Sequence, residues 1–212
     1  MEHFSITLLI IVLTCITSFM AFNNPVLRGA ALFYPFAMHN RGEWHRYLTS
    51  GFIHADFLHL AVNMYVLYSF GTVLEKVYLP IIFQDFALLV YIGIYFLGMI
   101  ISDVPSYYKH RRDATYRGLG ASGAVSAVLF SCILIGPFNG GIGLLFIPGL
   151  TISPLIFGIL YLAYSVYMGR LGRDNVNHDA HFYGAVFGFI FPGILKPELF
   201  ILLLEQIKAQ LG

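Results

Sequence analysis

Two polar residues lie where apolar stretches begin, and their side chains could together perform acyl-transfer chemistry. Ser122 lies in Gly120-Ala121-Ser122-Gly123, and His181 lies in Ala180-His181-Phe182-Tyr183-Gly184. A serine hydroxyl becomes an effective nucleophile when a neutral histidine takes its proton. An ionisable residue within a membrane helix costs about 2.5–3.5 kcal/mol on insertion scales, so it indicates a functional role. This combination is typical of peptide hydrolysis by a serine.

Donors for the negative charge of such a reaction also occur in the sequence. Hydrolysis builds charge on the carbonyl oxygen, which must be stabilised by hydrogen-bond donors. His59 and Asn63 are four residues apart, so they share one face of a helix, and both side chains can donate. Gly120 and Gly123 allow close approach of the backbone around Ser122, whose amide lies at a helix start, where an anion is favoured.

A stripe of small residues follows His181. Gly184 and Gly188 are four residues apart, which is the spacing that lets membrane helices pack closely. The stripe predicts that the helix of His181 packs against the helix of Ser122. His178 lies three residues before His181 and is the alternative base. We favour His181 because the glycines follow it, and we interpret His178 with Asp179 as the solvated entry to the helix.

The composition indicates a protein that lies in lipid. Of 212 residues, 58% are hydrophobic and 11% charged, and the mean hydropathy is +0.76. A soluble domain is about one quarter charged, so the missing charge predicts a lipid-facing surface. The net charge of +1 gives no case for a nucleic-acid partner. Cys15 and Cys132 lie in apolar stretches and are interpreted as small buried hydrophobes.

The pattern predicts an all-α, polytopic membrane protein with six spanning helices in a single domain, residues 1–212. A span needs roughly 20 apolar residues. The predicted spans cover about 4–22, 57–74, 86–102, 122–135, 151–168 and 180–195. A membrane-associated loop occupies 23–56, and 198–211 forms an amphipathic tail. The second, fourth and sixth spans start from the same side, which places His59, Ser122 and His181 at similar depth.

Several motifs, in this order, resemble the signatures of the rhomboid family of intramembrane serine proteases. They are Glu43-Trp44-His45-Arg46, His54, His59-Leu60-Ala61-Val62-Asn63, Gly120-Ala121-Ser122-Gly123, and the segment from Ala180 to Gly188. The resemblance covers most of the chain, from about Gly42 to Gly188.

The resemblance implies a six-helix rhomboid-like bundle that works with a Ser–His dyad. Ser122 would be the nucleophile and His181 the general base, while His59, Asn63 and the Ser122 amide would form the oxyanion hole. Glu43 and Arg46 are expected to form a structural pair in the first loop. No cofactor and no metal are expected. Substrates would be membrane-anchored or transmembrane proteins that enter sideways from the bilayer near the fifth span, and membrane lipids would be the other partners.

The sequence departs from the family pattern in two respects. Some rhomboids place a tyrosine four residues after the nucleophile to support the base histidine, whereas this chain has Ser126. What supports His181 is therefore open. The basic residues of the loops also gather on one face: Arg28, Arg41, Arg46, Lys109, Arg111, Arg112, Arg117, Arg170 and Arg173. The positive-inside rule would make this face cytoplasmic. The resemblance implies instead a bacterial inner membrane protein whose site faces outward, and we follow it.

Other interpretations of the same residues exist. Ser122 could be a helix N-cap and nothing more. The chain could be a catalytically inactive, client-binding relative, although both dyad residues are intact. A transporter with a histidine relay is disfavoured because the acidic residues lie at the predicted span ends. A metalloprotease is disfavoured because no His-Glu-x-x-His occurs.

Overall fold

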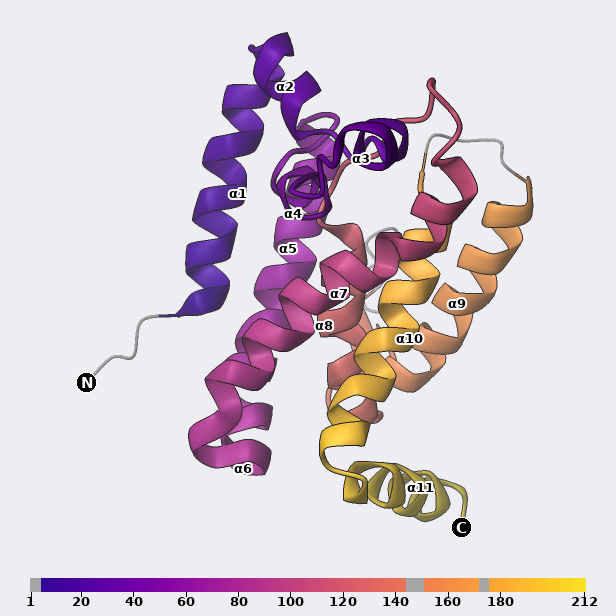
Figure 1. Cartoon of the computed structure of the whole chain (residues 1–212). Helices are drawn as coiled ribbons and strands as arrows, with labels where there is room; N and C mark the ends of the chain where they lie inside the picture. The colour runs from indigo at the N-terminus through magenta and orange to yellow at the C-terminus, as the bar shows by residue number, and fades with distance from the viewer. Residues whose placement is uncertain (1–4, 144–150, 172–175) are drawn as a thin grey trace.

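The computed structural model describes residues 5–143, 151–171 and 176–212 and is a bundle of α-helices. Its longer helices are α1 (Ile6–Phe22), α5 (Phe57–Val73), α7 (Ala87–His110), α8 (Ser122–Ile135), α9 (Pro154–Leu171) and α10 (His178–Leu195). Helix α8 lies at the centre, and every residue from Gly123 to Ile135 is buried. Figure 1 shows α5, α8 and α10 starting at the end of the bundle that carries the short helices α2, α3 and α4. This arrangement brings the predicted site residues to one end.

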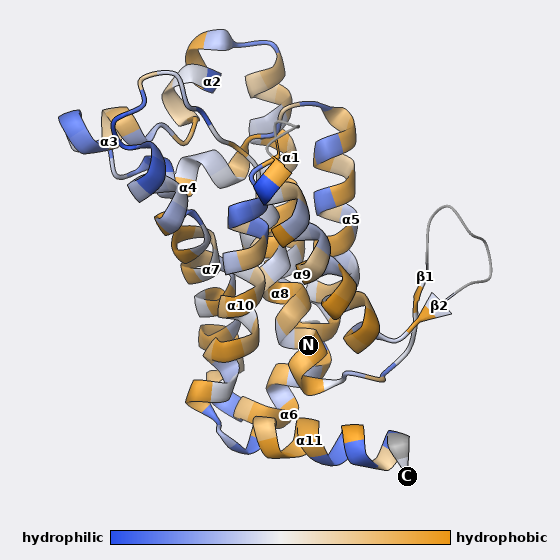
Figure 2. Ribbon diagram, turned by 90° about the vertical axis from the view of Figure 1, so that its right-hand side faces the viewer, coloured by the Kyte–Doolittle hydropathy of each residue, from blue (hydrophilic) through white to orange (hydrophobic). Residues whose placement is uncertain are grey.

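The outer surface of the bundle is apolar. Helix α1 exposes Val12, Ile16 and Phe19 to 53%, 52% and 50%. Figure 2 shows hydrophobic residues along the long helices, whereas hydrophilic residues gather around α3 and along parts of α11. A contiguous apolar surface of this kind requires lipid or another apolar partner. The chain is an all-α integral membrane protein.

The number of membrane crossings stays a prediction. By length and apolar composition, two stretches among the described residues are able to span a bilayer: Phe57–His110, in which helices α5 and α7 run in opposite directions, and α9. Helices α10 and α11 (Glu198–Leu211) together make a third candidate, bent by 112°. Helix α8 has 14 residues and is therefore about 21 Å long at 1.5 Å per residue, shorter than a bilayer core of about 30 Å.

Between α5 and α7 the chain reverses direction. The segment consists of a π-helical turn (η2, Leu74–Tyr78), α6 (Leu79–Phe83) and a 3-10 turn (η3, Gln84–Phe86). Gln84 has a φ of 49°, an uncommon backbone conformation for a residue other than glycine. Helix α7 then continues to His110, eight residues past the predicted end of the third span. The helix accommodates Asp103 because its carboxylate accepts a hydrogen bond from the Asn177 side chain, at 3.2 Å.

The fifth predicted span starts too early in the sequence. Thr151 and Ile152 form strand β2, which pairs antiparallel with β1 (Ile142–Gly143). Helix α9 begins at Pro154, since proline is suited to the first helical position and cannot pair within a strand ladder. It ends at Leu171, so the predicted range of 151–168 is shifted.

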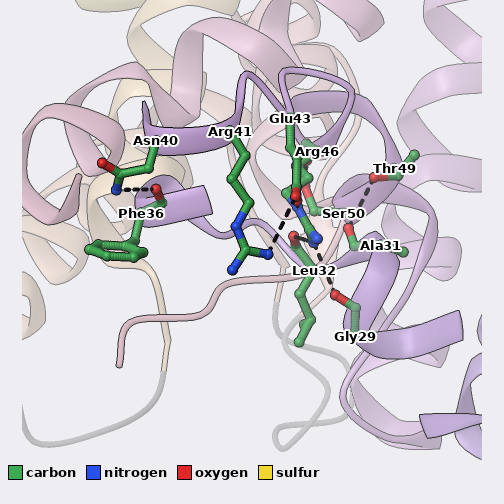
Figure 3. A network of polar contacts seen from close by, with 10 residues as sticks. All are labelled: Gly29, Ala31, Leu32, Phe36, Asn40, Arg41, Glu43, Arg46, Thr49 and Ser50. Carbon is green, nitrogen blue, oxygen red and sulfur yellow. Dashed lines mark hydrogen bonds and ion pairs between the residues drawn. The ribbon is translucent and has the colours of Figure 1, made fainter. Parts of the chain in front are cut away.

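The predicted membrane-associated loop, 23–56, folds into short helices. These are α2 (Pro25–Ala31), α3 (Pro35–Arg41), α4 (Arg46–Thr49) and the 3-10 turn η1 (Ser50–Phe52). Arg46 is buried and donates from Nε to Glu43, at 2.6 Å, and from Nη1 to the carbonyls of Gly29 and Leu32 (Figure 3). The hydrogen bond from Arg46 holds the pKa of Glu43 below its usual value. Arg46 thus links α4 to Glu43 and to the carbonyl groups around the end of α2, and this holds the loop together.

The opposite end of the bundle is held by polar contacts as well. The carboxylate of Glu75, in η2, accepts hydrogen bonds from Ser5 Oγ and from the amides of Ile6 and Thr7, at 2.8, 2.7 and 3.0 Å. A carboxylate is favoured there because the first amides of a helix lack intrahelical partners. Helix α11 matches the predicted tail, 198–211, and buries Leu199 and Leu203 against this end.

Candidate active site

The segment that leads into α8 is fixed from the first loop. The Gly118 amide and carbonyl pair with Phe33, and the Gly120 amide donates to the Ser50 carbonyl, each at 2.9 Å. Gly120 has a φ of 114°, which side chains rarely allow, and a Cβ there would lie 2.8 Å from Cε1 of His59. The ring of His59 thus lies against the backbone two residues before Ser122.

Ser122 is the first residue of α8, and the N-cap position belongs to Ala121. The alternative that Ser122 serves as the helix N-cap is therefore not supported. Ser122 is half-buried, whereas the residues that follow it in the helix are buried. Its amide lies in the first turn, where the N–H groups of a helix have no intrahelical acceptor.

His54 also fixes the segment that leads into α8. It is fully buried, its Nδ1 lies 3.0 Å from Ser18 Oγ, and its Nε2 accepts from the Ala121 amide at 3.4 Å. Because an amide can only donate, Nε2 carries no proton and Nδ1 does. The ring also meets His59 edge-on, with centroids 5.0 Å apart. Burial, followed by the nearby His59, lowers the pKa of His54 to about 3.

This depressed pKa predicts a loss of stability in mild acid. His54 in the unfolded chain takes a proton below about 6.5, its ordinary value, whereas the folded protein resists protonation until about 3. The stabilisation is fully present above pH 6.5 and falls as pH drops toward 3, by at most about 1.4 kcal/mol per pH unit. Denaturant unfolding in detergent between pH 7.5 and 4.5 measures it. His54→Gln should flatten the pH dependence, and exposed His45→Gln should leave it intact; an unchanged slope in His54→Gln would contradict the assignment.

Helices α8 and α10 touch through backbone atoms. A Cβ on Gly184 would overlap the Gly123 carbonyl oxygen, and one on Gly188 would overlap the Ala127 carbonyl oxygen. Ser131 Oγ bridges the two helices, 2.9 Å from the Ala127 oxygen and 2.7 Å from the Gly188 oxygen. The small-residue stripe therefore packs on the helix of Ser122.

The seam between α8 and α10 brings the predicted dyad residues to the same end. Ser122 adjoins Gly123, and His181 lies three residues before Gly184, on nearly the same helix face. A Cβ on Gly123 would also lie 3.5 Å from the Ala180 carbonyl oxygen, next to His181. Both side chains are half-buried. Proton transfer between them stays a prediction.

Asn63 lies on α5, one turn after His59. Its side chain is buried, and its Nδ2 donates to the His59 carbonyl at 2.9 Å. An amide group has two N–H donors, so this bond is compatible with the oxyanion role. The assignment of His59, Asn63 and the Ser122 amide to an oxyanion hole stays a prediction.

The start of α10 is built by residues that lie outside the sequence motifs. Asn177 caps the helix by accepting from the Ala180 amide at 3.1 Å, and it also contacts Asp103 and Ser106 of α7. The helix begins at His178, earlier than the predicted 180. An asparagine three residues before Ala180 is an N-cap signal that could have revealed this start.

His178 does not lie in solvent. Its side chain is 4% exposed, and its ring meets His181 and Tyr164 edge-on, with centroids 5.8 and 5.7 Å apart. The interpretation of His178 as a solvated entry is wrong. Asp179 points outward and forms an ion pair with Lys109 at 3.1 Å.

A small polar cavity adjoins Ser122. Its volume is about 20 Å³, which is sufficient for about one water molecule. The polar lining comes from Ser102, Asp103, Ser122 and Asn177. Among residues 5–143, 151–171 and 176–212, no three His, Cys, Asp or Glu side chains gather closely enough to hold a metal ion.

The fold and the site define a helical integral membrane protein with a serine and a histidine at one end of a tight helix–helix seam. The family model of the Rhomboid domain matches residues 41–198. The chain belongs to the rhomboid family.

Relatives with this domain occur in mitochondria and bacteria. The chain is 32% identical over 142 residues to the mitochondrial presenilin-associated rhomboid-like protein of Rattus norvegicus, covering 66% of this chain and 35% of that protein. It is 28% identical over 155 residues to the mitochondrial RHOMBOID-like protein 12 of Arabidopsis thaliana, covering 68% and 44%. The putative rhomboid protease YdcA of Bacillus subtilis is 31% identical over 149 residues, covering 70% and 66%.

The chain thus spans less than half the length of the first two relatives. Because the relatives include both mitochondrial and Bacillus subtilis proteins, they do not support a bacterial inner membrane over another compartment. An integral membrane location is what the domain and the apolar helices support.

Proposed function

We propose that the protein is an intramembrane serine endopeptidase that cleaves transmembrane or membrane-anchored proteins. The observation that carries the proposal is the backbone contact between Gly184 and Gly123. It leaves no room for a side chain between α8 and α10 at the level where Ser122 and His181 lie. A serine and a histidine at one end of such a seam favour nucleophilic catalysis.

In the proposed reaction His181 takes the proton of Ser122 Oγ as that oxygen attacks the scissile carbonyl carbon. The negative charge passes to the carbonyl oxygen, where the Ser122 amide, Asn63 and His59 would donate hydrogen bonds. His181 then gives its proton to the departing amine, and the peptide bond breaks to leave an acyl ester on Ser122. A water molecule, deprotonated by His181, then attacks the ester carbonyl carbon, and His181 returns the proton to Ser122 Oγ as the C–O bond breaks and the carboxylic acid product leaves. The polar cavity beside Ser122 supports this step because it has the size for one water.

Substrates are proposed to enter from the bilayer near α9. Only 17% of the most apolar stretch of this helix is buried inside the protein, compared with 39% for that of Phe57–His110. A helix with few interior contacts is the one that can be displaced with the smallest loss of packing. Lipids would cover the same surface in the absence of substrate. We also propose that the active site faces outward, on the side of the membrane opposite to the one that the positive-inside rule would favour.

Active-site labelling tests this function. A fluorophosphonate reagent should bond covalently to Ser122 of the purified protein, because the reagent reacts with an activated serine hydroxyl. Labelling should be absent in Ser122→Ala and intact in Ser69→Ala, which removes a half-buried serine of α5 whose hydroxyl donates to the Tyr65 carbonyl. A metal chelator should have no effect on labelling. An unlabelled wild-type protein would favour an inactive, client-binding relative, and chelator sensitivity would favour a metal-dependent reaction.

A further inference from the structure

A tyrosine from α9 lies against the predicted base. The ring of Tyr161 stacks on the ring of His181, with centroids 6.1 Å apart and planes inclined by 20°. This separation is within the 4.5–7 Å over which aromatic rings attract one another. His181 is also met edge-on by His178. The imidazole is therefore in contact with a flat ring that comes from a different helix.

Tyr161 is itself fixed by α8. Its hydroxyl lies 2.6 Å from Ser126 Oγ, and Ser126 is buried one turn after Ser122. Its ring packs between Phe130 and Phe157, with centroids at 5.7 and 6.0 Å. A side chain held by a hydrogen bond at its tip and by rings along its body has little rotational freedom.

We propose that Tyr161 is the positioning residue for His181 and that the hydroxyl of Ser126 holds it in place. The inference rests on the proposed function and names the support that the sequence left open. The ring limits rotation of the imidazole, so that one ring nitrogen stays directed at Ser122. Its π face also attracts the imidazolium that forms when His181 takes the proton. Tyr161 touches neither the substrate nor the reacting atoms in this arrangement.

The test compares kinetic constants of α9 and α8 variants on a transmembrane reporter in proteoliposomes. Tyr161→Leu should lower kcat about ten- to a hundredfold, a part of the 10²–10⁴ that a positioned general base contributes. KM should stay unchanged, because the ring does not bind substrate. Tyr167→Leu, which removes an exposed tyrosine from the same helix, is the matched control and should leave kcat unchanged.

The role of the hydroxyl pair is tested by a double-mutant cycle. Tyr161→Phe and Ser126→Ala remove the same hydrogen bond, so each should lower kcat by a smaller factor than Tyr161→Leu, and the double variant should be no worse than either single one. Ser126→Tyr, made in the Tyr161→Leu protein, supplies an aromatic ring from α8 in place of the one lost from α9. This double variant should recover part of the lost kcat. A merely structural role for Tyr161 would not produce this recovery.

The outcomes separate the inference from the proposed function. Wild-type kcat in Tyr161→Leu, or a loss confined to KM or to thermal stability, overturns the positioning role while Ser122 labelling continues to support the protease. A wild-type protein that neither cleaves the reporter nor reacts with the fluorophosphonate overturns the proposed function and this inference with it.

Discussion

Ser122→Ala and His181→Ala are each expected to abolish cleavage of a transmembrane reporter while the protein still inserts and folds. In serine proteases the nucleophile and base act as a unit, and loss of either one costs about 10⁴-fold or more in kcat. Both side chains are half-buried at the end of the α8–α10 seam, so truncation to alanine removes little packing. Reporter cleavage in membranes, with expression and thermal unfolding measured in parallel, checks the result.

His178→Ala is the matched control for the base. His178 lies one turn before His181 and contacts its ring, so its removal should weaken activity far less than removal of His181. Activity lost only in His178→Ala would transfer the base assignment to that residue. Full activity in either Ser122→Ala or His181→Ala would remove the dyad.

Gly184→Val is expected to abolish activity through packing. A Cβ on Gly184 would overlap the Gly123 oxygen and lie 2.9 Å from the Gly123 carbonyl carbon, where only backbone could give way. Overpacking of this kind costs typically about 1–3 kcal/mol and displaces neighbouring elements. The displacement would separate α10 from α8, and with them His181 from Ser122.

Gly184→Ala tests the same contact with a smaller change. It should lower both the melting temperature and kcat, by less than valine does. Gly29→Ala is the matched control, because a Cβ on Gly29 meets nothing within 4 Å. A Gly184→Val protein with wild-type activity would show that the seam tolerates separation, and the geometric basis of the proposed function would be lost.

Helix α8 could be predicted to the residue. Its start follows a glycine-rich turn, and Gly136-Pro137 ends it, so local signals coincide with the tertiary structure. The tail helix, 198–211, could be predicted from its amphipathic pattern, and α11 occupies these residues. The seam itself was also predicted, because Gly184 and Gly188 are spaced for close packing and do contact α8.

Other features could not be read from local pattern. The hydropathy pattern predicts that the third helix ends before Asp103, the first charged residue. In the structure Asp103 lies within α7, where it accepts a hydrogen bond from Asn177, a residue 74 positions away. The neighbouring Asp179 indicates a solvated His178, yet the side chain of His178 is buried, whereas that of Asp179 pairs with the exposed Lys109. The contact of Tyr161 with Ser126 joins residues 35 apart on different helices, and no periodicity within either helix indicates it.

The carboxylate of Glu75 has a bearing on how the chain is assembled. Translation runs from the N-terminus, so Ile6 and Thr7 are made before Glu75, and their amides lack this acceptor until residue 75 has been added. The two amides gain their acceptor only when the segment after α5, which carries Glu75, packs against the start of α1. Because one carboxylate accepts from two amides and a hydroxyl, it fixes the position of the start of α1 relative to the segment that follows α5.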